Sequence, residues 1–157
     1  MIVVETAIDI ARPSADVFDF VADQTNAPRW QHGLVEVERV TPGPIGVGTE
    51  HVFVRRFAGR RLSSRNRYTH FVPERYVAFE FPDGWARGRA SYLVEAVGPT
   101  LTRLWSRVEL DVGGAFGVLA PMLARVLERD TRTDEAVLRS LLGASAPRAD
   151  VANGRTR

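Results

Sequence analysis

The chain has 157 residues, 45% of them hydrophobic and 25% charged, a composition typical of one globular domain. It contains no cysteine, which excludes disulfides, thiol catalysis and zinc–thiolate sites. The formal net charge is +2, and all 21 basic residues are arginine. Because these arginines are spread along the chain and interleaved with acids, they favour a solvated surface over a nucleic-acid-binding site.

Neither targeting nor membrane insertion is predicted. The first residues lack the basic and apolar regions of a signal peptide. No apolar run approaches the roughly 18 residues that a membrane span needs. We therefore expect a cytoplasmic protein without stable membrane insertion.

The first 32 residues predict a strand followed by two short helices. Residues 2–10 alternate between apolar and polar side chains, as in a half-buried strand. Pro13 and Ser14 then give a helix start, and apolar residues between 17 and 21 continue at helical spacing. Residues 26–32 indicate a second short helix or turn, which carries Trp30.

The middle of the chain predicts strands separated by turns. Alternating or apolar runs are bounded by glycine and proline clusters such as those at 42–44 and 98–99. With residues 2–10 they predict about seven antiparallel strands in a meander. The later strands are expected at 34–40, 49–57, 61–72, 77–81, 87–97 and 101–112.

The C-terminal part changes to helical periodicity. Residues 115–142 predict one long amphipathic helix, with Pro121 in its opening turns, where proline is tolerated or kinks the helix. Residues 143–157 are small and polar, and we expect them to form a disordered tail. The chain is therefore expected to form an α+β domain over residues 1–142.

A hairpin in the middle of the chain places polar side chains on an apolar face. A type II′ turn at Gly59-Arg60 would set Phe53 opposite Asn66 and His51 opposite Tyr68. Opposed residues share a face. Polar groups among aromatic rings need partners, because each unsatisfied one costs about 1–3 kcal/mol. A water-filled, ligand-binding cavity would supply partners; alternatively, His51 and Tyr68 hydrogen-bond each other in a packed core, with Arg55 at its solvent rim.

The order strand, two helices, six strands and a long helix resembles the START-like or SRPBCC superfamily, closest to its polyketide cyclase/dehydrase and lipid-transport branch. The resemblance covers about residues 1–142 and rests on short motifs: IDIARP leading into VF, PRW, GPIGVGT, RRFAGRR and LAPMLA. It implies a helix-grip fold (START/Bet v 1-like), with the curved sheet wrapped around the C-terminal helix and a cavity between them. It carries over no catalytic residues, because this scaffold serves many functions.

The expected cavity lining combines the hairpin with neighbouring elements. Trp30 would either gate the cavity mouth or anchor its short helix in the core. Met122 and Val126 are expected to face the cavity from the long helix, although a plain core position suits them equally. The full candidate set is Trp30, His51, Phe53, Arg55, Ser64, Asn66, Tyr68, Tyr92, Ser106, Met122 and Val126.

Three functions are compatible with this pattern. The favoured one is a non-catalytic carrier or sensor of a hydrophobic small molecule, which is lipid-, polyketide- or aromatic-like. The second is a polyketide cyclase or dehydratase that needs no cofactor, with His51 and Tyr68 as an acid/base pair and Arg55 and Asn66 binding an oxyanion or carboxylate. The third is a protein-interaction module that uses the sheet edge or Trp30.

No metal site, cofactor or phosphate loop is predicted. His32, His51 and His70 lack acidic companions at ligand spacing. The glycine-rich segment 43–48 lies between strands, without the helix start and lysine of a phosphate loop. The sequence leaves the ligand and the oligomeric state, monomer or dimer, open.

Overall fold

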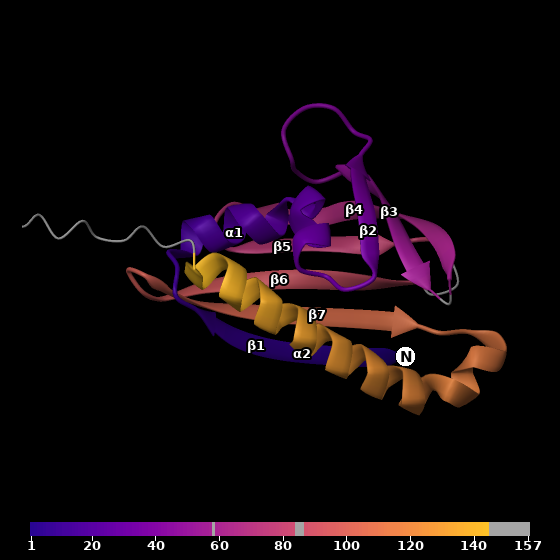
Figure 1. Ribbon diagram of the computed structural model, residues 1–157. Helices are drawn as coiled ribbons and strands as arrows, with labels where there is room; N and C mark the ends of the chain where they lie inside the picture. The colour runs from indigo at the N-terminus through magenta and orange to yellow at the C-terminus, as the bar shows by residue number, and fades with distance from the viewer. Residues whose placement is uncertain (58, 84–86, 145–157) are drawn as a thin grey trace, which may run out of the picture.

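A computed structural model describes residues 1–57, 59–83 and 87–144 of the chain. One antiparallel sheet runs in the order β1-β7-β6-β5-β4-β3-β2, so consecutive strands pair as in a meander and β1 closes against β7 (Figure 1). The strands are β1 (Ile2–Ile10), β2 (Leu34–Arg39), β3 (Glu50–Phe57), β4 (Arg60–Val72), β5 (Tyr76–Phe81), β6 (Arg87–Gly98) and β7 (Leu101–Asp111).

The helices follow the predicted order with shifted boundaries. After β1 come α1 (Ser14–Ala22) and the 3-10 helix η1 (Gln24–Arg29). After β7, a 3-10 helix η2 (Gly114–Leu119) precedes α2 (Ala120–Ala144). The single helix expected from residue 115 is therefore divided, and Pro121 lies in the first turn of α2, where its missing N–H has no helical partner to lose. Most of the expected tail, residues 145–157, lies outside the described residues.

The register of the β3–β4 hairpin differs from the expected one by two residues. β3 ends at Phe57 and β4 begins at Arg60, so the connection is one residue earlier than Gly59-Arg60. Gly59 has a φ of 75°, which glycine adopts without strain. His51 consequently pairs with Asn66 and not with Tyr68. Because the shift is an even number of residues, every side chain keeps the face that the sequence predicted.

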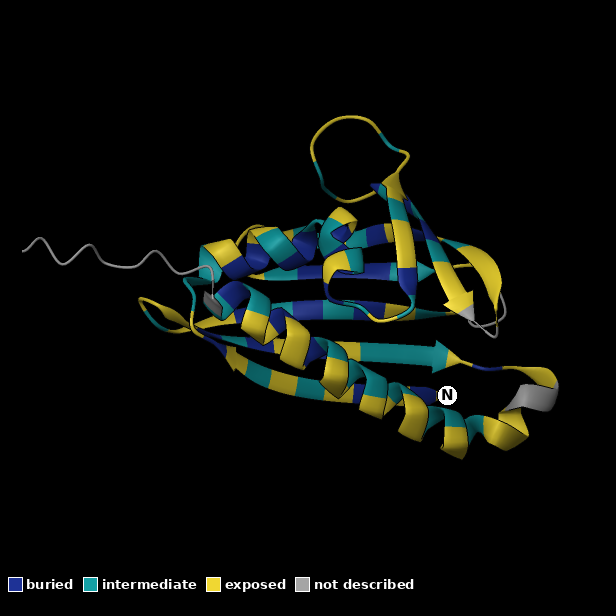
Figure 2. Cartoon of the chain, viewed as in Figure 1, coloured by how far each residue is buried: buried dark blue, intermediate teal, exposed yellow. Residues whose placement is uncertain are grey.

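The core lies between the sheet and the two α-helices, and we call this side of the sheet its inner face. Figure 2 shows buried residues gathered along the central strands and on the side of α1 that contacts them. Phe18 of α1 and Leu138 of α2 join Leu104 of β7 in the largest apolar cluster. The helix α2 packs chiefly along β1. The Arg12 side chain donates a hydrogen bond to the carbonyl oxygen of Leu142, in the last turn of α2, at 3.1 Å.

Candidate functional site

A chain of ring contacts crosses the inner face. His51 stacks on Tyr68, with ring centroids 5.3 Å apart. Tyr68 contacts Phe79 at 5.7 Å, and Phe79 contacts Tyr92 at 6.0 Å. Tyr92 in turn contacts Trp30 at 6.2 Å. The interior is therefore lined by aromatic rings from β3 to β6, with a polar group at each end of the chain of rings.

The first polar group is the cross-strand pair His51 and Asn66, which we call the His51–Asn66 pair. Both residues have no solvent-exposed surface. Both ring nitrogens of His51 and both amide atoms of Asn66 lack a hydrogen bond of good geometry among the described residues, although the Asn66 side chain lies close enough to the imidazole to act on its pKa. Burial without partners is costly for such groups, at about 1–3 kcal/mol each. The pair therefore leaves donors and acceptors available inside an otherwise apolar layer.

Burial also sets the protonation state of the pair. The pKa of His51 lies below its ordinary value, because burial disfavours the charged imidazolium, an effect that the nearby carboxylate of Asp23 opposes. The imidazole is thus neutral at pH 7, with one nitrogen as donor and the other as acceptor. Asn66 adds a donor and an acceptor of its own, so the pair can satisfy a ligand group that both gives and takes a hydrogen bond.

The Tyr68 hydroxyl makes structural hydrogen bonds and does not bond to His51. It donates to the carbonyl oxygen of Ala22 at 2.5 Å and accepts from the backbone N–H of Gln24 at 3.3 Å. Burial raises the pKa of the phenol above its ordinary range. These bonds tie β4 to the junction between α1 and η1. The alternative prediction of a His51–Tyr68 hydrogen bond is thus wrong, because the two rings stack and the Tyr68 hydroxyl has other partners.

The second polar group joins three elements around Gln31. Arg55 of β3 donates to Oε1 of Gln31 at 3.2 Å, and Nε2 of Gln31 donates to the Tyr92 hydroxyl at 3.4 Å. Arg55 is an exposed residue. Desolvation by neighbouring protein groups lowers the pKa of its guanidinium, whereas Tyr92 and Asp134 act to raise it. Burial raises the pKa of Tyr92 as well.

Two acidic residues of α2 complete this second group. The half-buried Asp134 accepts the backbone N–H of His32 at 2.8 Å, and burial raises its pKa. Glu135 is only 2% exposed and accepts a short hydrogen bond from the hydroxyl of Thr6. Next to Thr6 in the sheet, the buried hydroxyl of Ser106 has no partner among the described residues.

Sequence reasoning missed Gln31, Asp134 and Glu135. Asp134 and Glu135 occupy the buried stripe of α2, between Leu127 and Leu138 at helical spacing. An acidic residue in an apolar stripe could have revealed them, but the expected cavity-facing residues Met122 and Val126 each lie one residue before the packed stripe. Those two residues are 55% and 43% exposed and lie outside the core.

The other expected residues divide between core and rim. Trp30 is 7% exposed and belongs to the main core cluster, so it serves as an anchor and does not present a surface. Phe53 is buried between His51 and Phe81, with centroid distances of 6.5 Å and 6.2 Å. Ser64, which pairs with Phe53, is partly exposed.

Arg55 and Asn66 do not form one anion site. Arg55 pairs with Leu62, whereas Asn66 pairs with His51, four residues along β3 from Arg55. At the rise of a strand, four residues separate the two positions by about 13 Å. The expected joint oxyanion or carboxylate site is therefore not assembled, and the guanidinium interacts with Gln31 instead.

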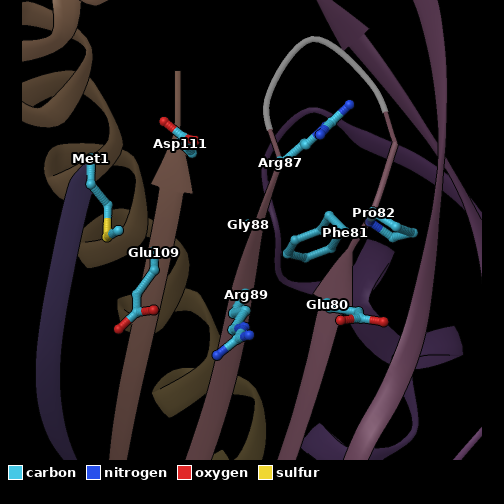
Figure 3. A pocket seen from close by; sticks show the side chains of 9 residues that line it. All are labelled: Met1, Glu80, Phe81, Pro82, Arg87, Gly88, Arg89, Glu109 and Asp111. Atoms are coloured by element: carbon cyan, nitrogen blue, oxygen red, sulfur yellow. The ribbon is translucent and has the colours of Figure 1, made fainter. Parts of the chain in front are cut away.

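A hollow lies on the opposite face of the sheet, which we call its outer face. It has a volume of about 420 Å³, and its lining includes the charged side chains of Glu80, Arg89 and Glu109 (Figure 3). These residues face away from α2, which passes behind the strands in this view. Neighbouring ion pairs, Arg67 with Glu80 and Arg107 with Glu5 and Glu109, neutralise much of this face. The face of the sheet opposite α2 carries none of the predicted site residues.

The described ranges of the chain contain no group of three or more His, Asp or Glu side chains placed to hold a metal ion. None of the helices in the described part has both the length and the hydropathy for a transmembrane span.

An antiparallel sheet with two short helices after its first strand and a long final helix defines a helix-grip protein of the START-like superfamily. The chain matches the family described as polyketide cyclase / dehydrase and lipid transport over residues 1–142, and it belongs to that family. No curated protein matches its sequence at a significant level.

Solved structures share the fold at low sequence identity. A protein from Thermus thermophilus is 17% identical with a TM-score of 0.77, over 92% of this chain and 99% of the other. A START superfamily protein from Mycobacterium smegmatis is 12% identical with a TM-score of 0.77, over 93% and 100%. The Zhui aromatase/cyclase from a Streptomyces species is 18% identical with a TM-score of 0.71, over 92% and 98%. At such identities these likenesses show the fold alone.

Proposed function

We propose that this protein binds a hydrophobic small molecule between the inner face of its sheet and α2. The observation that carries the proposal is a set of buried polar atoms on His51, Asn66 and Ser106, which make no hydrogen bond of good geometry within the described part of the chain. They come from β3, β4 and β7: His51 stacks on Tyr68 and pairs with Asn66, and Ser106 pairs with Tyr92. Natural cores rarely keep such groups unpaired, and a functional role is a common reason when they do. A bound molecule would supply their missing hydrogen bonds.

Ligand access requires a rearrangement near Phe53. The His51–Asn66 pair has no exposed surface, so a ligand reaches it only when a neighbouring ring moves. Tyr68 is held by two hydrogen bonds, whereas Phe53 packs through ring contacts against His51 and the partly exposed Phe81. We therefore assign Phe53 as the ring that swings aside. Moving Phe53 leaves no hydrogen-bonding group without its partner, whereas moving Tyr68 would strand the carbonyl of Ala22 and the N–H of Gln24.

The test is native mass spectrometry of freshly purified protein, followed by denaturing extraction of any bound molecule. The proposal predicts a co-purified apolar compound, or saturable uptake of one by stripped protein. The matched variant Phe53→Trp narrows the space around the pair and is expected to reduce occupancy. Stripped protein that takes up no apolar compound would contradict the proposal.

A second candidate function is cofactor-free cyclase or dehydratase chemistry on a polyketide-like substrate. The neutral imidazole of His51, with both nitrogens unpartnered, is the observation that favours it, because a general base needs a free lone pair. Tyr68 is a poor partner in this chemistry, since its proton is donated to Ala22 and its pKa is raised. His51→Ala would then remove turnover, whereas Tyr68→Phe would mainly affect stability; unchanged turnover in His51→Ala would refute the catalytic role.

A further inference from the structure

We infer that the His51–Asn66 pair selects ligands whose buried end is an uncharged group that both donates and accepts hydrogen bonds, such as a hydroxyl or a primary amide. This inference rests on the proposed function and narrows the class of ligand. It starts from the pairing of the two residues across β3 and β4, and from the four side-chain polar atoms that they leave unpartnered.

The hydrogen-bonding capacity of the pair is balanced. A neutral imidazole offers one donor and one acceptor, and a carboxamide offers donors and an acceptor. This balance holds whichever way the Asn66 amide is oriented and whichever imidazole tautomer is present. A ligand hydroxyl can therefore donate to one member and accept from the other. A group that only accepts, such as a carboxylate or an ether, would leave an acceptor of the pair without a partner.

The surroundings of the pair disfavour an ionised ligand. The residues in ring contact with His51 are Phe53 and Tyr68, and neither carries a charge at pH 7. The charged groups that act on His51 are Asp23, which raises its pKa, and Arg39, which lowers it. Arg39, which pairs with His51 across β2 and β3, is solvent-exposed, so an anion at the pair would be buried with no buried cation beside it among the described residues, which is unfavourable. Arg55, the cation on the same face of β3, is four residues away and interacts with Gln31.

Three naphthalene probes of nearly equal size separate these chemistries. Naphthalene has no polar group, 2-naphthol carries a neutral hydroxyl, and 2-naphthoate is an anion at pH 7.4. Isothermal titration calorimetry with stripped protein is expected to give a dissociation constant for 2-naphthol about tenfold lower than for naphthalene, as two net hydrogen bonds would produce. The dissociation constant for 2-naphthoate is expected to be the highest of the three.

Two variants locate the selectivity. Asn66→Leu keeps the approximate side-chain volume and removes the polar atoms, so it should abolish the preference for 2-naphthol while naphthalene still binds. Ser63→Ala, on the opposite and exposed face of the same strand, should leave the preference unchanged. Naphthalene binding also reports whether each variant is folded, and His51→Phe provides a second removal of polar atoms in case Asn66→Leu does not fold.

The outcomes distinguish this inference from the proposed function. If 2-naphthoate binds as tightly as 2-naphthol, or if the preference survives in both Asn66→Leu and His51→Phe, the selectivity is refuted while interior binding stands. If none of the three probes binds the stripped protein, the proposed function itself is contradicted.

Discussion

Replacing Asn66 with leucine should stabilise the ligand-free protein. Asn66 is fully buried with both amide atoms unpartnered, and each such atom costs about 1–3 kcal/mol. Leucine has a similar volume and lacks those atoms, but its shape differs, and misfit in a packed core typically costs up to about 1.5 kcal/mol. The net gain in the free energy of unfolding should be about 1–2 kcal/mol. For a domain of this size, each 1 kcal/mol raises Tm by about 2–4 °C.

The assay is urea and thermal unfolding of stripped protein, with Ser63→Ala, on the exposed face of β4, as the control. Stability should rise in Asn66→Leu while affinity for hydroxylated ligands falls, the trade-off expected of a functional buried polar group. A loss of more than about 1 kcal/mol would refute the reasoning, because it would show that the amide is already hydrogen-bonded in the free protein.

Further expectations concern hydrogen bonds and pH. Tyr68→Phe strands the backbone groups of Ala22 and Gln24, so urea unfolding should show a loss of about 1–3 kcal/mol; an unchanged midpoint would contradict this. Because folding lowers the pKa of His51, the unfolded chain holds that proton more tightly, and stability should fall as the pH drops below about 6.5, less steeply in His51→Phe. Folding raises the pKa of Asp134, so the stability that this carboxyl contributes is fully present below pH 3.8 and is lost as the pH rises through the raised value. Asp134→Asn should remove this decline in the free energy of unfolding. Identical pH profiles of stability for the variant and the original protein would disprove the expectation.

The strand pattern was readable from the sequence because period-two alternation and glycine-rich turns are local signals. The face of the sheet on which each side chain of β3 and β4 lies was also predicted correctly, because the error in the β3–β4 register is an even number of residues. The error arose because residues 58–61 offer two adjacent places for a two-residue turn around Gly59. Turn chemistry alone does not choose between them, whereas pairing with the rest of the sheet does.

The long helix was predicted, but its buried stripe was not. Apolar residues lie on both the packed side and the exposed flank of α2, for example Leu127 against Val126. Hydrophobicity therefore did not distinguish the two stripes. The packed one includes Asp134 and Glu135, whose burial depends on Thr6 and His32 from distant parts of the chain. Such partners are set by tertiary structure, and a single sequence does not reveal them.

The sharpest test is NMR of the Asn66 side-chain amide and the His51 ring during titration of stripped protein with 2-naphthol. Interior binding predicts saturable shifts of both sets of resonances, with the backbone amide of the outer-face residue Glu80 as a reference that stays in place. Saturable binding that moves Glu80 and leaves Asn66 and His51 unchanged would place the ligand outside the interior and contradict the proposed function.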